Sequence, residues 1–123
     1  MKVFYSETQQ LHDPSGFIRS GTVQPSPECP ERARRFLDAV NAAGHEIVAP
    51  EQHGLAPVAA IHAPDYLRFL ETAHARWPQL PGAGPEVIAN VDPGRHMVAR
   101  PEHITGEAGF FMADTACPVG AGT

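Results

Sequence analysis

Positive charge is scarce in this sequence. Nine lysines and arginines stand against fourteen aspartates and glutamates in 123 residues, which gives a formal net charge of −5, and no block of like charge occurs. Binding to the phosphates of a nucleic acid requires a basic stripe or patch. We therefore expect no nucleic-acid partner. An acidic surface favours a cationic ligand, although the same net charge also serves solubility alone.

Cysteine and long apolar runs are equally scarce. The two cysteines, Cys29 and Cys117, form no C-x-x-C motif, and the first residues lack the apolar segment of a secretory signal. The apolar stretches are far shorter than the roughly 20 residues that a membrane helix needs. These features predict two reduced thiols in a cytoplasmic protein without membrane contact.

Aromatic residues make up only 7% of the chain, whereas proline and glycine are frequent, with 13 and 11 residues. A chain of this length has the size of one domain. Its share of proline and glycine stays below that of disordered chains. The composition therefore predicts long irregular loops that cross one globular core.

The predicted elements of the first half alternate between strand and helix. A β-rich run at residues 2–5 predicts a strand, and residues 6–30 predict a long irregular connection. Between Pro30 and Gly44 the apolar residues recur at helical spacing, which predicts a helix with a glycine stop. Residues 46–49 then predict a second strand.

The second half contains one clear helix and a second long loop. One or two helical turns are predicted within residues 57–62, and a longer helix over residues 64–77. Residues 78–104 show no sustained period and predict a loop with at most a short strand at 87–88. A modest apolar segment at residues 108–113 has no assigned structure.

The order strand, helix, strand, helix predicts an α/β fold with parallel pairing. Two short strands do not make a stable open sheet, and parallel sheets are normally covered on both faces. We therefore expect the chain to be an unfinished part of a larger α/β domain.

The sequence contains no complete catalytic constellation. No H-x-x-x-H or H-E-x-x-H spacing occurs. The seven histidines are His12, His45, His53, His62, His74, His96 and His103. A G-x-S-x-G elbow and a phosphate-binding glycine loop are also lacking, and Cys29 has no histidine nearby in sequence. The polar candidates are Arg32, Glu107 and Asp114, of which Arg32 is expected to pair with a nearby carboxylate such as Glu28.

Several segments nevertheless resemble one family. The proline-rich stretch ending in PERA at residues 30–33 resembles a signature near the start of histone-deacetylase-like amidohydrolases. Residues 61–71, IHAPDYLRFLE, resemble that family's H-x-x-x-Y-L-x-F-L-E segment. Bacterial acetylpolyamine amidohydrolases are the branch that the chain resembles most. The shorter segments that also resemble this branch are KVFYS at 2–6, GFF at 109–111 and P-x-x-x-G-T at 118–123.

This resemblance implies an arginase/deacetylase-like three-layer α/β fold with a parallel sheet, in a protein of roughly three times this length. Family members use zinc-activated water to hydrolyse an N-acetyl amide to acetate and a free amine. Their Asp, His and Asp zinc ligands, tandem histidines and oxyanion-stabilising tyrosine lie in later segments, and no His-His pair or Asp-x-His occurs here. The resemblance thus implies that residues 1–123 are the amino-terminal part of one domain, with no catalytic residue and no designed metal site.

The resemblance also implies binding roles for three residues. Arg32 matches an arginine of the internal channel, where a guanidinium holds the released acetate. Asp114 lies near a family carboxylate at the rim of a cleft for a cationic acetylated amine. Thr105 stands in place of a second rim carboxylate, with Glu107 two positions away, and this departure weakens the implied preference for polyamines. Residues 6–30 match an insertion at a dimer interface, which predicts a homodimer.

These observations leave alternative functions open. The first is the amino-terminal segment of a zinc-dependent amidohydrolase that deacetylates acetylated polyamines or other N-acetyl amines and is inactive alone. The second is a non-catalytic binding or dimerisation module derived from that family; the third is a small α/β domain with a coincidental likeness. A stable dimer with a cooperative melt favours the second, whereas aggregation or molten-globule behaviour favours the first.

Overall fold

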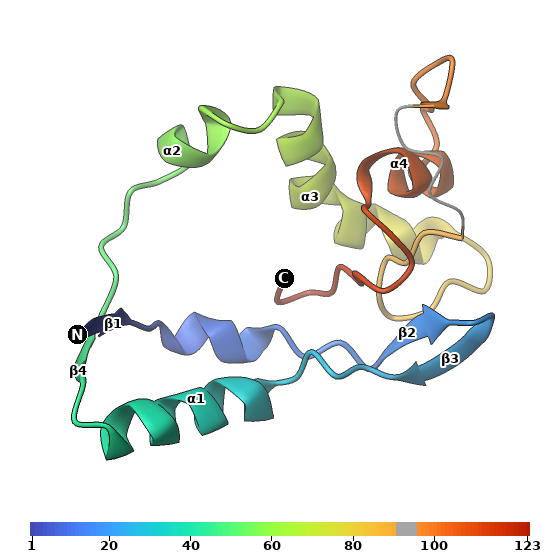
Figure 1. Cartoon of the computed structure of the whole chain (residues 1–123). Helices are drawn as coiled ribbons and strands as arrows, with labels where there is room; N and C mark the ends of the chain where they lie inside the picture. The colour runs from blue at the N-terminus through green and yellow to red at the C-terminus, as the bar shows by residue number, and fades with distance from the viewer. Residues whose placement is uncertain (91–95) are drawn as a thin grey trace.

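A parallel pair of strands lies at the amino-terminal end of the chain, as the sequence predicted (Figure 1). The structure, a computed structural model, describes residues 1–90 and 96–123. Strand β1 (Lys2–Phe4) pairs with β4 (Glu46–Val48), and Val3 stands opposite Ile47 in the register. Within the described ranges the chain is mixed α/β, which confirms the predicted fold class.

Helix α1 (Pro30–Ala42) connects the two parallel strands. Pro30 occupies the first turn, where its missing N–H and fixed φ are tolerated. The helix ends before Gly44, whose φ of 66° lies in the left-handed region that glycine adopts without steric cost. Both predicted boundaries of this helix are therefore confirmed.

The segment 6–30 is more ordered than the predicted irregular connection, and that prediction is wrong in this respect. It contains the 3₁₀-helix η1 (Glu7–Leu11) and a hairpin of β2 (Gly16–Arg19) and β3 (Thr22–Pro25). The two-residue turn Ser20-Gly21 has positive φ at both positions, which matches the twist of antiparallel strands. Neither strand shows a clean alternation of apolar and polar residues, so the turn was the sole local signal.

The hairpin is also held by a segment far away in the sequence. Ile18 donates its backbone N–H to the carbonyl of Thr115 at 3.3 Å, and the Thr115 hydroxyl donates to the carbonyl of Ile18 at 3.2 Å. Contacts of this range leave no trace in local sequence patterns. They explain why the order of this segment was not predicted.

The buried core lies between α3 (Pro64–Arg76) and α4 (Ile104–Phe111), together with the segments that flank them. Its buried apolar residues are Phe69, Ala73, Trp77, Val87, Ala89, Ile104, Ala108, Met112 and Val119. Helix α3 confirms the helix predicted over residues 64–77. Helix α4 was not predicted, because it has only eight residues, carries two interior glycines and shows no single polar face.

In the second predicted loop, residues 78–104, the 3₁₀-helix η2 (Trp77–Gln79) overlaps the start. Val87 makes an isolated antiparallel bridge with Val119, so the predicted short strand at 87–88 is reduced to one paired residue. Residues 91–95 of this loop lie outside the described ranges. No helix of the described residues is long and apolar enough to cross a membrane.

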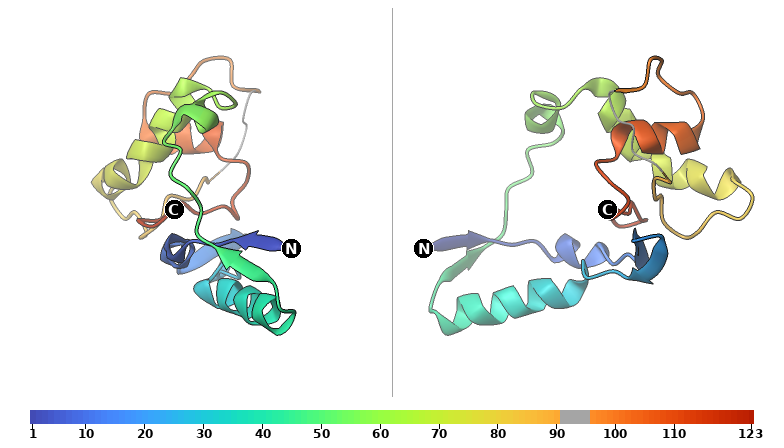
Figure 2. Two further views of the ribbon diagram at one scale, coloured as in Figure 1. Left: turned by 90° about the vertical axis from the view of Figure 1, so that its left-hand side faces the viewer. Right: turned by 45° about the vertical axis from the view of Figure 1, so that its right-hand side comes forward.

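The elements form two groups, joined by an extended segment after β4 and by the hairpin (Figure 2). The first group holds β1, β4, η1 and α1, and the second holds α3 and α4. Helix α2 (Ala56–Ala59), which confirms the helical turns predicted within 57–62, lies between the groups with every residue exposed. Helix α1 buries no residue fully, and Phe36 is 66% exposed.

Candidate functional site

A ladder of alternating charges links α3, α4 and the segment before α4. Glu107 Oε2 lies 2.6 Å from Arg76 Nη2, and Glu107 Oε1 lies 3.8 Å from Arg100 Nη2. The other end of the Arg100 guanidinium, Nη1, lies 3.3 Å from Asp65 Oδ2. We call Arg76, Glu107, Arg100 and Asp65 the charge ladder.

Glu107 is the buried member of this ladder, at 8% exposure. An ionised carboxylate in an apolar environment is costly unless cations or hydrogen bonds compensate it. The 2.6 Å contact with Arg76 lacks hydrogen-bond geometry, so the compensation is chiefly Coulombic. Because two guanidinium groups face it, Glu107 presents little net negative charge to the surface.

An aromatic hollow of about 580 Å³ lies beside the charge ladder. Its lining residues are Ile61, His62, Ala63, Asp65, Tyr66, Phe110 and Phe111. The rings of Tyr66 and Phe111 lie with their centroids 6.0 Å apart, and Arg100 stands over the Phe111 ring at 5.3 Å. The hollow thus offers apolar ring faces with one carboxylate, Asp65, which Arg100 already neutralises in part.

Arg32 lies in the other group of elements, on the first turn of α1. It forms an ion pair with Glu28, as the sequence predicted, and both side chains are about half exposed. Gln9, His12 and Phe36 lie with this pair around a hollow of about 260 Å³. Arg32 is therefore an accessible cation at the edge of a small depression, already paired with one carboxylate.

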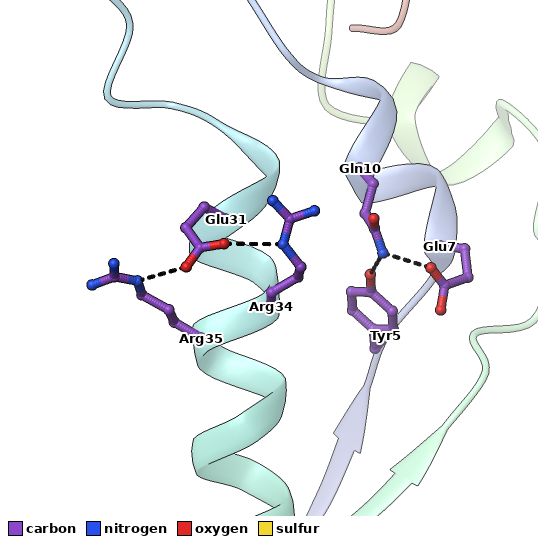
Figure 3. Close-up of polar contacts among 6 residues, drawn as sticks. All are labelled: Tyr5, Glu7, Gln10, Glu31, Arg34 and Arg35. Carbon is purple, nitrogen blue, oxygen red and sulfur yellow. Dashed lines mark hydrogen bonds and ion pairs between the residues drawn. The ribbon is translucent and has the colours of Figure 1, made fainter.

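The neighbouring arginines of α1 are tied to another carboxylate (Figure 3). Glu31 accepts one hydrogen bond from Arg35 Nε and one from Arg34 Nε, each at 3.0 Å. These hydrogen bonds hold the pKa of Glu31 below its ordinary value, Arg35 having the larger effect. Because Arg34 and Arg35 turn toward Glu31, Arg32 is the α1 arginine that lines the hollow.

A network of hydrogen bonds lies within residues 5–10, in the segment where η1 contacts α1 (Figure 3). Gln10 donates through Nε2 to the Tyr5 hydroxyl at 2.9 Å and to Glu7 Oε2 at 2.7 Å. This network connects the end of β1 to η1. Gln9 of η1 and His12, which follows it, line the Arg32 hollow.

Asp114 is exposed and lies just beyond the carboxyl end of α4. Its Oδ1 accepts the backbone N–H of Ala116 at 2.6 Å, so the carboxylate closes a local turn. Burial, and secondarily the Asp114 carboxylate, raise the pKa of the Cys117 thiol. Asp114 is thus an available negative charge, and Cys117 stays protonated at neutral pH.

The structure does not bring the three predicted residues into one site. Glu107 and Asp114 belong to α4 and the turn after it, whereas Arg32 belongs to α1, which lies in the other group of elements (Figure 1). Among residues 1–90 and 96–123, no group of three or more histidine, cysteine, aspartate or glutamate side chains is placed to hold a metal ion. The described part of the chain therefore does not fit a zinc ion.

Sequence reasoning missed Arg76, Arg100 and Asp65 as partners of Glu107, and it missed the role of Glu86. The buried Glu86 accepts hydrogen bonds from the backbone N–H of Ser15 at 2.8 Å and from its hydroxyl at 3.1 Å. Ser15 and Glu86 are 71 positions apart. Neither Glu107 nor Glu86 gave a local signal for its contacts, because the partners Arg76 and Ser15 lie far away in the sequence.

Comparison with solved structures identifies the class of fold. The chain superposes on the crystal structure of acetylpolyamine aminohydrolase from Burkholderia pseudomallei with a TM-score of 0.83 and 34% identity. The match covers 100% of this chain and 36% of that chain. The fold is therefore that of the arginase/deacetylase-like α/β proteins, as expected.

Comparison with curated proteins finds relatives named acetylpolyamine amidohydrolase. The chain is 36% identical over 127 residues to the acetylpolyamine amidohydrolase of Burkholderia pseudomallei (strain 1710b) and 37% identical over 125 residues to that of Mycoplana ramosa. Each match covers 100% of this chain and 36% of the relative. The chain is homologous to the acetylpolyamine amidohydrolases and corresponds to an amino-terminal portion of about a third of their length. No family model matches the sequence.

Proposed function

We propose that this chain is the amino-terminal part of a zinc-dependent amidohydrolase that removes the acetyl group from acetylated polyamines or other N-acetyl amines. The observation that carries the proposal is homology over the whole chain to enzymes named acetylpolyamine amidohydrolase, of which the chain spans 36%. The reaction breaks the amide bond with water and yields acetate and a free amine. The zinc ion is proposed to be held outside the described residues, so no step of the reaction is assigned to a metal here.

In this proposal the chain contributes scaffold and binding groups. The charge ladder supports Asp114, rather than Glu107, as the carboxylate that attracts a cationic amine. Glu107 is buried and faces two arginines, whereas Asp114 is exposed, accepts the backbone N–H of Ala116 and interacts with the Cys117 thiol. A single exposed carboxylate attracts a cation weakly, which is consistent with a broad preference for N-acetyl amines.

Arg32 is proposed to bind the acetate product through charge-assisted hydrogen bonds. Glu28 already presents a carboxylate to the same guanidinium. Acetate must therefore compete with Glu28, and release of this pair would open the Arg32 hollow to the product. Its volume of about 260 Å³ is ample for an acetate ion.

An assay of the isolated chain tests whether catalysis depends on segments outside these 123 residues. We expect the 123-residue chain to show no hydrolysis of an N-acetylated diamine above the buffer rate, with or without added Zn²⁺, because the described residues offer no metal site. Acetate release would be measured by a coupled assay, with the full-length Mycoplana ramosa relative as the positive control. Turnover that a chelator abolishes would contradict the assignment of catalysis to other segments.

A homodimer through the hairpin of β2 and β3 is proposed as the assembly. All residues of β3 are exposed, and its Val23 side chain is 76% exposed on an edge strand. An exposed strand edge is a template for pairing with a second chain. Light scattering should show a dimer that Val23→Asp converts to a monomer; a wild-type monomer would overturn this assembly and also the alternative of a dimerisation module.

A further inference from the structure

The turn that carries Asp114 is joined to the hairpin by its next residue, Thr115. Ile18 of β2 donates its backbone N–H to the Thr115 carbonyl at 3.3 Å, and the Thr115 hydroxyl donates to the Ile18 carbonyl at 3.2 Å. In an antiparallel strand the N–H and C=O of one residue point to the same edge. One edge of β2 therefore pairs with β3, and the opposite edge bonds to Thr115.

This turn, residues 113–117, is anchored at both ends in the core. Met112 before it is buried, and Val119 after it exchanges two backbone hydrogen bonds with Val87, at 2.9 and 3.0 Å. The middle of the turn lies at the surface, where Asp114 is exposed and Thr115 is half-buried. The orientation of the middle therefore depends on the contacts that it makes there.

Two sets of hydrogen bonds fix the middle of the turn. Asp114 Oδ1 accepts the backbone N–H of Ala116 at 2.6 Å, which closes the backbone around Thr115. Thr115 itself bonds to Ile18, which is 97 positions away in the sequence. The Asp114 carboxylate is thus tied to the backbone conformation of Thr115, and that conformation is tied to β2.

We propose that Thr115 is a positioning residue, which holds the Asp114 carboxylate in one place for a cationic amine by anchoring the turn to β2. This inference rests on the proposed function for the ligand of Asp114. It adds the residue that orients the carboxylate, and Thr115 acts through Asp114 rather than on the ligand. A carboxylate already held in place loses less conformational freedom when it binds a cation than a mobile one does.

Three substitutions separate positioning from the simple loss of a contact. Thr115→Val removes the hydroxyl and keeps the β-branched shape, Thr115→Ser keeps a hydroxyl, and Thr8→Val makes the matched change at an exposed threonine of η1. Each is made in the 123-residue chain, and in a chimera in which these residues replace the matching third of the Burkholderia pseudomallei relative. Thr115→Val is also combined with Asp114→Asn.

In the 123-residue chain, labelling of Cys117 by a thiol reagent reports the position of Asp114, because desolvation and, secondarily, that carboxylate raise the thiol pKa. In a Cys29→Ser background, we expect Thr115→Val to move the midpoint of labelling against pH to a lower value, whereas Thr115→Ser and Thr8→Val retain the original profile. In the Asp114→Asn background Thr115→Val should move the midpoint less, because the coupling between the two positions is then absent. This readout does not depend on catalysis.

In the chimera, KM and kcat are compared for an N-acetylated diamine and for an uncharged N-acetyl alkylamine. Thr115→Val should raise KM for the diamine about two- to fivefold, which is the effect of an exposed ion pair. It should leave kcat and the KM of the uncharged substrate unchanged, since Thr115 touches no reacting atom. Thr115→Ser should restore the original KM for the diamine, and Thr8→Val should not change it.

Three results would overturn the inference. They are an equal shift of the Cys117 midpoint, or no shift, with and without the Asp114 carboxylate, an equal change of KM for both substrates, and unfolding of the Thr115→Val chain, which Trp77 fluorescence reports and which would assign Thr115 to stability alone. An inactive chimera with the expected Cys117 profiles would contradict the proposed function and leave the positioning role intact. An active chimera that tolerates Thr115→Val would do the reverse.

Discussion

At the scale of single residues, the functional assignment depends on how each charge is compensated. Glu107, Asp114 and Arg32 are all polar candidates in the sequence, but their surroundings differ. Glu107 is buried between two guanidinium groups, Asp114 is exposed, and Arg32 is half exposed beside one carboxylate. A compensated buried charge stabilises the fold, whereas an accessible charge attracts ligands.

Glu107→Gln should therefore destabilise the chain. The substitution leaves Arg76 and Arg100 without their shared carboxylate, and because both arginines are partly exposed to water the expected loss is about 1–2 kcal/mol. Trp77, the single tryptophan, is buried next to Arg76 and reports unfolding in urea by fluorescence. The exposed Glu71→Gln on α3 is the matched control and should leave the urea midpoint unchanged; equal midpoints for the two variants would contradict the role of the ladder.

Cys117 should react slowly with a thiol reagent at neutral pH, although its side chain is exposed. Partial desolvation of the sulfur and, secondarily, the Asp114 carboxylate raise the pKa of the Cys117 thiol, so its thiolate fraction is small and grows only at alkaline pH. Because the folded-state pKa of the Cys117 thiol is raised, the protonated thiol contributes to stability at low pH. This contribution is lost as pH rises through the folded-state pKa. Labelling rates against pH would be measured in a Cys29→Ser background.

The substitution Asp114→Asn separates the two causes of the raised Cys117 pKa, which are desolvation and the Asp114 carboxylate. It removes the smaller effect, so the midpoint of the labelling profile should move to lower pH without reaching that of a free thiol. An unchanged profile would show that the Asp114 carboxylate does not act on Cys117.

At the scale of elements, the two groups are connected where the last turn of the chain meets η1. His12 Nδ1 lies 3.0 Å from Thr123 Oγ1, and the backbone of Gly122 passes against Leu11. A side chain at Gly122 would overlap the Leu11 carbonyl, so glycine is required there for close approach and not for its φ. The contact places η1 beside the second group.

Gly122→Ala should push the last turn away from η1 and destabilise the chain by about 1–3 kcal/mol, because backbone rather than a flexible side chain blocks the new methyl group. Gly84→Ala is the matched control, since nothing lies within 4 Å of its added Cβ. Thermal melts followed at Trp77 would compare the two variants. Equal melting temperatures would contradict the close approach.

At the scale of the whole molecule, burial is distributed unevenly. The described buried apolar residues belong to the group of α3 and α4, whereas α1 buries none of its residues fully and α2 is entirely exposed. Local stability follows the density of buried apolar contacts. The isolated chain should therefore open first in its amino-terminal group.

Hydrogen exchange followed by mass spectrometry should show slow exchange for peptides from α3 and fast exchange for peptides from α1, at a pH where the chain is folded. Peptides from α2, whose residues are all exposed, provide the fast-exchanging reference. Equal protection of α1 and α3 in the isolated chain would contradict the uneven distribution of stability.

Local patterns in the sequence determined β1, α1, β4, α2 and α3, the parallel class of the sheet and the resemblance to acetylpolyamine amidohydrolases. Each of these elements carries its own signal, such as the prolines that open α1 and α3 or Gly44 after α1. The resemblance depended on short motifs whose residues are adjacent in the chain, and the relatives confirm it.

Tertiary structure alone decided α4 and the charge ladder, and it decided the hairpin together with the local signal of the Ser20-Gly21 turn. Their stabilising contacts join residues far apart in the chain, such as Ser15 to Glu86 and Arg76 to Glu107, and a local pattern carries no record of such pairs. It also decided that Glu107 is neutralised and that the apolar Phe4 side chain is exposed. Both properties depend on which side chains fold around a group, because burial and compensation are set by three-dimensional neighbours rather than by residue type.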